Sequence, residues 1–195
     1  MDKNTDITVA VMALQGAFLE HQQMIERIGA HSVLIRNLSD WEEYAGDGDM
    51  RNKGLIIPGG ESTAMMRITR DLGLEQPLRQ AIGHGMAVLG TCAGLIMLDG
   101  HHLATMDITV KRNAYGRQLG SFTTVHEMRG IGPIPMTFIR APYIEKAGKG
   151  VEVLSVLDGH IVSARQGKQL VCAFHPELTD DTRVHEMFLR LCAAD

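Results

Sequence analysis

Three short, largely apolar runs, each followed by a glycine-containing turn, constrain the fold of this 195-residue chain more than any other feature. They occupy residues 7–13, 55–57 and 86–89. Such runs are typical of strands that are covered on both faces, as in a parallel sheet. Stretches with helical apolar spacing lie between them, at residues 20–28, 63–72 and 76–82. This alternation predicts one α/β domain over residues 1–195, with three α/β/α layers around a mostly parallel sheet.

The second half of the chain has a different order of predicted elements, in which strand patterns follow one another with few helices between them. Antiparallel strands added at one edge of the sheet would fit this spacing. A helical pattern over residues 182–192 closes the chain. The polar stretch 40–53 is expected to be a surface loop. Strands are expected at residues 32–35, 107–110, 136–139, 151–156, 160–165 and 170–174.

Composition argues against several classes of protein. A net charge of −4 provides no basic surface for nucleic acid or an anionic membrane. The apolar stretches are far shorter than the ~20 residues that cross a bilayer. Three cysteines without a close pair argue against a disulfide framework, so a reducing, cytoplasmic location is expected. No metal is expected, because His101 and His102 lack a third ligand at a sensible spacing.

A cysteine follows the apolar run at residues 86–89, within the sequence Gly-Thr-Cys-Ala-Gly at residues 90–94. A strand, a tight turn with small residues and a helical run have the layout of a nucleophile elbow. At such a turn, the helix N-terminus would favour a Cys92 thiolate, and the Ala93 N–H would point at an oxyanion. By itself the turn leaves two interpretations balanced, a nucleophile and a buried structural cysteine.

A histidine and a glutamate follow the last predicted strand, in the sequence Phe-His-Pro-Glu at residues 174–177. Pro176 favours an extended conformation at His175, which would place the side chains of His175 and Glu177 on the same side. Glu177 could then fix the tautomer of the imidazole. Alone, His175 fits a strand-end histidine with a local hydrogen bond, but together with Cys92 it favours a nucleophile–base–acid arrangement.

Six motifs extend this pattern over nearly the whole chain, from about Ile7 to Leu191. The chain resembles the triad-type class I glutamine amidotransferases, and within them the glutaminase subunits of pyridoxal 5'-phosphate synthase. Two loops depart from the family pattern, because residues 40–53 look longer and residues 99–102 look shorter than expected. The motifs are LQGAFLEH at 14–21, PGGEST at 58–63, GTCAGLIML at 90–98, KRNAYGRQ at 111–118, FIRAP at 138–142 and FHPELT at 174–179.

The resemblance implies a fold of the flavodoxin-like, class I glutamine amidotransferase type and the hydrolysis of L-glutamine to glutamate and ammonia. Cys92 would attack the side-chain amide, His175 would transfer protons and Glu177 would orient His175. The ammonia would pass to a synthase subunit, within a large hetero-oligomer, that builds pyridoxal 5'-phosphate. The resemblance implies no cofactor for this chain.

The resemblance also assigns binding residues. The backbone N–H groups of Gly60 and Ala93 are the expected oxyanion hole. Gln15 would lie near the partner interface. From spacing alone, Arg112 would be a solvated surface charge, but the family pattern places it at the substrate. The residues expected around glutamine are Gly60, Glu61, Ser62, Arg112, Ile139 and Arg140.

Two other functional classes are compatible with parts of the sequence. A stress-response hydrolase or chaperone with a cysteine elbow would explain residues 90–94 but not the motifs at 111–118, 138–142 and 174–179. A catalytically inactive binding subunit would not need the intact set of Cys92, His175 and Glu177.

Overall fold

The structure is a computed structural model that describes residues 6–46, 48–112 and 121–194. Within these residues, nine strands form one sheet and two more form a hairpin. The strands are β1 (Thr8–Met12), β2 (His31–Ile35), β3 (Lys53–Ile57), β4 (Ala87–Thr91), β5 (Ile108–Lys111), β6 (Ser121–Met128), β7 (Gly132–Ile139), β8 (Tyr143–Ala147), β9 (Glu152–Leu157), β10 (His160–Gln166) and β11 (Gln169–Cys172).

The large sheet has a parallel half and an antiparallel half. Its strand order is β2-β1-β3-β4-β11-β10-β8-β5, and β9 pairs with β10 beside this path. Neighbours from β2 to β11 run parallel, whereas β10 pairs antiparallel with β11, β8 and β9. The β6–β7 hairpin forms a separate antiparallel sheet. The prediction of a mostly parallel sheet with antiparallel additions at one edge is therefore confirmed.

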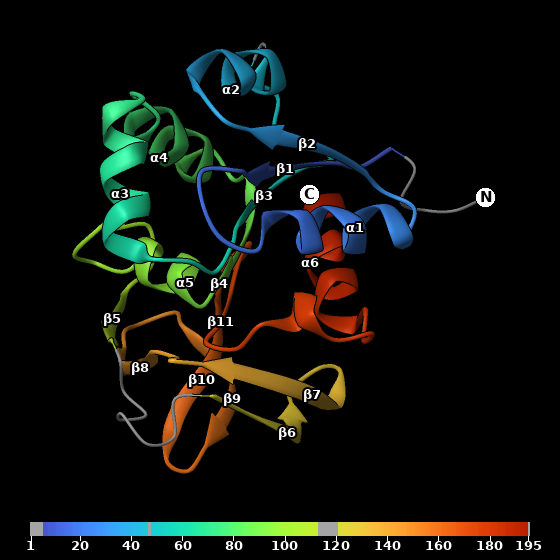
Figure 1. Cartoon of the computed structure of the whole chain (residues 1–195), viewed down its shortest axis with the longest axis vertical. Helices are drawn as coiled ribbons and strands as arrows, with labels where there is room; N and C mark the ends of the chain where they lie inside the picture. The colour runs from blue at the N-terminus through green and yellow to red at the C-terminus, as the bar shows by residue number, and fades with distance from the viewer. Residues whose placement is uncertain (1–5, 47, 113–120, 195) are drawn as a thin grey trace.

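Helices cover both faces of the parallel half (Figure 1). Helices α1 and α6 lie on one face, α3, α4 and α5 lie on the other, and α2 lies beside β2. None of the described helices is long and apolar enough to cross a membrane. The helices are α1 (Phe18–Arg27), α2 (Leu38–Ala45), α3 (Ser62–Asp71), α4 (Glu75–Gly83), α5 (Ala93–Leu98) and α6 (Arg183–Ala193), with a short 3₁₀ helix η1 (Pro176–Leu178) before α6.

The last helix packs directly on the central strands, and a glycine makes this possible. A Cβ atom on Gly54 of β3 would lie 2.6 Å from Cys192 Sγ and 2.7 Å from the Phe188 ring. Phe188 is fully buried, and burying such a side chain contributes about 1.5–3 kcal/mol. The contact fixes α6, and with it the preceding residues that carry His175 and Glu177.

The stretch 40–53 differs from the expected surface loop, because α2 occupies its first part. The Asn37 side chain caps this helix by accepting a hydrogen bond from the Asp40 N–H. Trp41 and Tyr44, three residues apart, turn inward and are buried. Two apolar residues at helical spacing therefore outweigh the polar composition of the segment.

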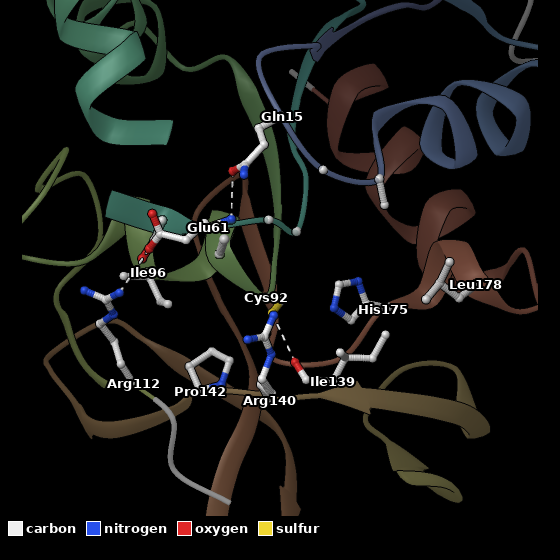
Figure 2. Close-up of a pocket in the computed structure, with 16 residues that line it drawn as sticks. Gln15, Glu61, Cys92, Ile96, Arg112, Ile139, Arg140, Pro142, His175 and Leu178 are labelled. Carbon is white, nitrogen blue, oxygen red and sulfur yellow. Dashed lines mark hydrogen bonds and ion pairs between the residues drawn. The ribbon is translucent and has the colours of Figure 1, made fainter. Parts of the chain in front are cut away.

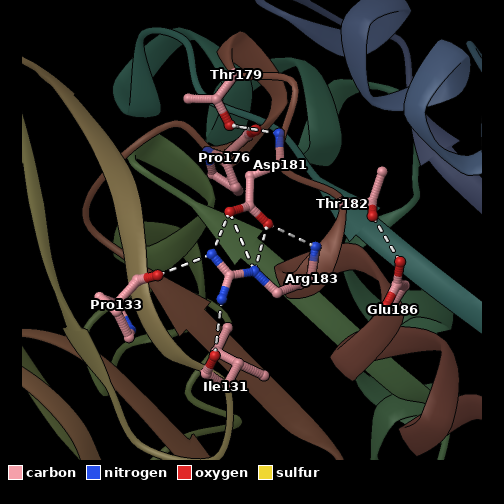
Figure 3. Close-up of polar contacts among 8 residues, drawn as sticks. All are labelled: Ile131, Pro133, Pro176, Thr179, Asp181, Thr182, Arg183 and Glu186. Atoms are coloured by element: carbon pink, nitrogen blue, oxygen red, sulfur yellow. Dashed lines mark hydrogen bonds and ion pairs between the residues drawn. The ribbon is translucent and has the colours of Figure 1, made fainter.

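An arginine ties the start of α6 to the β6–β7 hairpin (Figure 3). The Arg183 guanidinium donates to both carboxylate oxygens of Asp181 and to the carbonyls of Ile131 and Pro133, the last at 2.7 Å. Arg183 also holds the pKa of Asp181 below its usual range by hydrogen bonding to the carboxylate. The segment between β11 and α6 is consequently anchored at its far end.

Candidate active site

A cavity of about 510 Å³ opens at the carboxyl ends of the parallel strands (Figure 2). Sites in open α/β sheets lie at this edge, where the loops after neighbouring strands converge. Loops after β1, β3, β4, β7 and β11 contribute to its wall. Its lining is Gln15, Gly16, Ala17, Gly59, Gly60, Glu61, Ser62, Cys92, Ala93, Ile96, Arg112, Ile139, Arg140, Pro142, His175 and Leu178.

Cys92 occupies a strained turn between β4 and α5, as predicted from the small residues around it. Its backbone φ is +49°, a value that residues other than glycine rarely adopt. A Cβ atom on Gly94 would lie 1.9 Å from the Ile57 carbonyl oxygen, so only glycine fits there. Cys92 is 8% exposed, and its thiol lies 3.9 Å from the carbonyl oxygen of Ile139. The strain is therefore concentrated at a side chain that faces the cavity.

His175 lines the cavity and forms a buried pair with Glu177, which lies behind it. His175 Nδ1 lies 2.7 Å from Glu177 Oε1, and each residue is 6% exposed. The predicted pairing is confirmed, but the predicted cause is wrong. Residues Pro176–Leu178 form a 3₁₀ helix and are not extended. The tight turn brings the Glu177 carboxylate back to the imidazole ring. The backbone N–H of His175 donates to the backbone carbonyl of Thr137 in β7 at 2.8 Å.

The charges around His175 stabilise its protonated form. Burial lowers the pKa of His175, but hydrogen bonds to Cys92 and Glu177 and their negative charges outweigh burial and raise this pKa to about 10. Burial raises the pKa of Glu177, whereas His21 and His175 lower it, and the net result is below the usual value. The arrangement thus favours an imidazolium held by the Glu177 carboxylate.

Gly59 provides a flat surface for the imidazole. A Cβ atom on Gly59 would lie 2.3 Å from His175 Cε1, and a Cβ atom on Gly16 would lie 1.7 Å from the Gly59 carbonyl oxygen. No side chain fits at residue 59 unless the ring moves. The glycines after β3 therefore set the position of the histidine.

Replacing Gly59 with alanine is expected to displace the His175 ring and to lower turnover of the site's substrate by at least about 10-fold, since a misplacement of about 1 Å can cost 10²-fold. Gly83→Ala is the matched control, because a Cβ atom there meets nothing within 4 Å and α4 tolerates alanine. The measurement is kcat of both variants at equal folded concentration. Equal activity of Gly59→Ala and Gly83→Ala would contradict the assigned role of Gly59.

Charged and polar groups form the opposite wall (Figure 2). The Glu61 carboxylate caps α3 by accepting hydrogen bonds from the N–H groups of Thr63 and Ala64. Arg112 lies 3.3 Å from Glu61 Oε1, and Gln15 Oε1 accepts a hydrogen bond from the Glu61 N–H at 2.9 Å. The capping N–H groups and Arg112 lower the pKa of Glu61. This wall presents a fixed carboxylate and an accessible guanidinium.

The structure brings the other predicted residues to the same cavity. Gly60 and Ala93 line it beside Cys92, together with Ser62, Ile139 and Arg140. Arg140 adopts a φ of +44°, the second strained residue at the cavity. Residues 113–118 of the motif that contains Arg112 lie outside the described residues.

Sequence reasoning missed a second row of polar residues behind Glu177. His21, Thr91 and His185 are completely buried, and His21 contacts both of the others. His21 is the last residue of the motif at residues 14–21, and this position was the one sequence signal that could have indicated a role for it. No comparable signal marks His185, since it lies on an ordinary amphipathic helix.

Comparison with solved structures places this fold among the glutamine amidotransferases. A crystal structure described as a glutamine amidotransferase is 39% identical, with a TM-score of 0.85, and the match covers 95% of this chain and 99% of that one. A glutamine amidotransferase from Thermotoga maritima is 12% identical with a TM-score of 0.61, over 97% of this chain and 90% of that one, and it shares the fold.

Residues 11–194 match the model of the SNO glutamine amidotransferase family, and the chain belongs to that family. A curated relative, the pyridoxal 5'-phosphate synthase subunit PdxT of Streptococcus pneumoniae serotype 2 strain D39, is 49% identical over 191 residues. That match covers 94% of this chain and 97% of the relative. PdxT of S. pneumoniae strain 70585 matches to the same extent.

Proposed function

We propose that this chain is the glutaminase subunit of a pyridoxal 5'-phosphate synthase, and that it hydrolyses L-glutamine to L-glutamate and ammonia. The observation that carries the proposal is the convergence of Cys92, on its strained turn, with the buried His175–Glu177 pair at one cavity. Membership of a glutamine amidotransferase family and 49% identity to PdxT support the choice of substrate and pathway.

The proposed reaction proceeds through a thioester on Cys92. His175 accepts the thiol proton, and the sulfur forms a bond to the carbonyl carbon of the glutamine side chain. The C–N bond then breaks, and the amide nitrogen leaves as ammonia with the proton from His175. Water next attacks the γ-glutamyl thioester while His175 takes its proton, and cleavage of the C–S bond releases glutamate and regenerates Cys92. Glu177 keeps His175 oriented throughout.

The cavity offers a matching group for each part of glutamine. The N–H groups of Gly60 and Ala93 are proposed to stabilise the oxyanion, since donors preorganised there act only as charge develops. Arg112 and Arg140 are proposed to bind the α-carboxylate. Glu61, with its carboxylate fixed by the α3 cap, is proposed to accept the α-ammonium. Ser62 and Ile139 complete the proposed binding site.

The product ammonia is proposed to pass directly to a synthase subunit in a hetero-oligomer. Gln15 lies on the loop after β1, and its side chain accepts a hydrogen bond from the backbone N–H of Glu61. We propose that Gln15 lies at the interface with the synthase subunit. Three free cysteines fit a reducing compartment, so we place the complex in the cytoplasm. The reaction uses side chains of this chain alone and needs no cofactor.

The test is an assay of glutamate and ammonia release from L-glutamine, with and without the synthase subunit. Weak hydrolysis by the chain alone and a clear increase on adding the synthase are expected, because unregulated hydrolysis would waste glutamine. No hydrolysis under either condition would favour a stress-response protein or an inactive subunit. Full activity that the synthase does not change would contradict the proposed coupling.

A further inference from the structure

A buried row of imidazoles continues the His175–Glu177 pair into the protein interior. His21 Nε2 lies 3.3 Å from Glu177 Oε2 and 3.1 Å from Thr91 Oγ1. His21 Nδ1 lies 2.9 Å from His185 Nε2. His21, Thr91 and His185 are fully buried. The row thus connects α1 and α6 to the far side of the Glu177 carboxylate.

The hydrogen-bonding possibilities select one arrangement of protons along this row. Among the described residues, His185 Nδ1 has no hydrogen-bond partner. If His185 carried its proton on Nδ1, a buried donor would be left unpaired, which costs more than an unpaired acceptor here. His185 therefore carries it on Nε2 and donates to His21 Nδ1. His21 then carries its own proton on Nε2, facing Glu177 and Thr91.

This arrangement gives the second oxygen of Glu177 a nearby donor. Among the described residues, Oε2 is buried without a hydrogen-bond partner, and His21 Nε2, which is hydrogen-bonded to Thr91 Oγ1, lies 3.3 Å from it. A buried carboxylate oxygen without a donor is costly, so the carboxylate gains from a nearby N–H. With Oε2 facing His21, Oε1 stays directed at His175 Nδ1.

We infer that His21 is a positioning residue of the reaction, which acts on Cys92 through Glu177 and His175 and is itself oriented by His185. The inference rests on the proposed function. A histidine that only filled the core could be replaced by an apolar residue of similar size without affecting the chemistry. A positioning histidine must retain a donor toward Glu177 Oε2.

Burial keeps His21 uncharged at neutral pH, against the charges of two carboxylates. Burial lowers the pKa of His21, and the nearby His175 adds to this effect. Glu177 on η1 and Glu20 on α1 oppose it, but the pKa remains below the ordinary value. His185 on α6 is held well below its ordinary pKa by burial and by His21. A neutral ring has one N–H, which in the tautomer above is directed at Thr91 Oγ1 at 3.1 Å, with Glu177 Oε2 3.3 Å from the same nitrogen.

The test compares His21→Leu with His21→Gln in the complex with the synthase. His21→Leu is expected to lower kcat roughly 10-fold to 100-fold with little change in KM, the size seen when the partner of a functional histidine is removed. Without the donor the pKa of Glu177 rises, so the acidic limb of the kcat/KM profile should move to higher pH. His21→Gln keeps an N–H near the position of Nε2. It should therefore retain most of the wild-type kcat, and the acidic limb of its kcat/KM profile should lie at the wild-type pH.

His102→Leu is the matched control, because His102 Nδ1 lies 2.7 Å from the buried Asp99 carboxylate but does not line the cavity. It should lower stability and leave the profile unchanged. Wild-type kcat and an unmoved acidic limb in folded His21→Leu would overturn the inference, as would a failure of His21→Gln to recover either. Loss of hydrolysis by the wild type would instead reject the proposed function.

A second measurement serves if His21→Leu does not fold. The ¹⁵N NMR spectrum of the wild type, labelled at histidine, reports which ring nitrogen carries the proton. A neutral His21 protonated at Nε2 is expected, and it should remain so across the pH range of activity. A His21 protonated at Nδ1, or doubly protonated at neutral pH, would overturn the inference.

Discussion

Replacing Cys92 with alanine is expected to lower glutamine hydrolysis by at least about 10⁴-fold, as removal of a nucleophile does in other triads. The reason is that no thioester can form, and the other thiols do not line the cavity. The fold should persist, because alanine keeps the Cβ atom that the turn before α5 already accommodates and adds no bulk. The measurement is glutamate release by the complex, with circular dichroism to verify folding.

Cys192→Ala is the control for this prediction. Cys192 is buried against β3, where burial raises the pKa of its thiol to about 12, so it carries no thiolate at neutral pH. Its replacement should leave kcat within about 2-fold of the wild type, as expected of a change outside the site. Persistent hydrolysis by Cys92→Ala would refute the nucleophile, and an equal loss in Cys192→Ala would point to unfolding.

Replacing Glu177 with glutamine is expected to lower kcat about 10²-fold to 10⁴-fold, the upper value being that for the equivalent change in a serine protease triad. The amide N–H₂ can donate to His175 Nδ1, which would leave the imidazole proton on Nε2, facing the sulfur. That tautomer cannot accept the thiol proton. The measurement is kcat of the complex at saturating glutamine.

The pH profile of Glu177→Gln supplies a second expectation with a defined sign. A carboxylate beside His175 contributes to raising the pKa of the imidazole to about 10, so its removal lowers that pKa. The alkaline limb, where the imidazolium loses its proton, should therefore move to lower pH. Glu152→Gln is the control, because Glu152 pairs with Arg129 and Arg165 away from the cavity. An unchanged limb in Glu177→Gln would contradict the role of the carboxylate.

The parts of the site that local sequence specifies could be predicted. Gly90 is required by its contact with Gly94 in the same turn, so the cysteine between these glycines could be placed on a strained backbone from the sequence. The pairing of His175 with Glu177 depends on only two residues of separation, although the turn that produces it is a 3₁₀ helix. Parallel strands then bring both segments to one edge, as the alternating pattern indicated.

The parts that depend on packing could not be predicted. The contact between His21 and His185 joins residues 164 apart and exists only because α1 and α6 lie on the same face of the sheet. Helix α2 was missed because its buried residues, Trp41 and Tyr44, are surrounded by polar ones. In both cases, packing against distant parts of the chain determines whether these residues are buried. A single sequence does not show which distant residues will pack together.

The position of β11 in the sheet determines when this enzyme can become reactive. Strand β11 lies between β4 and β10, and the backbone N–H of Cys92, just beyond β4, donates to the carbonyl of Cys172, the last residue of β11. During synthesis, residues 90–94 emerge about 80 residues before β11 does, and such distant pairings form late. The thiol therefore meets His175 only after the last strand has entered the sheet. A nascent or truncated chain without β11 therefore lacks the histidine that the proposed reaction needs, and the two groups come together only when folding is complete.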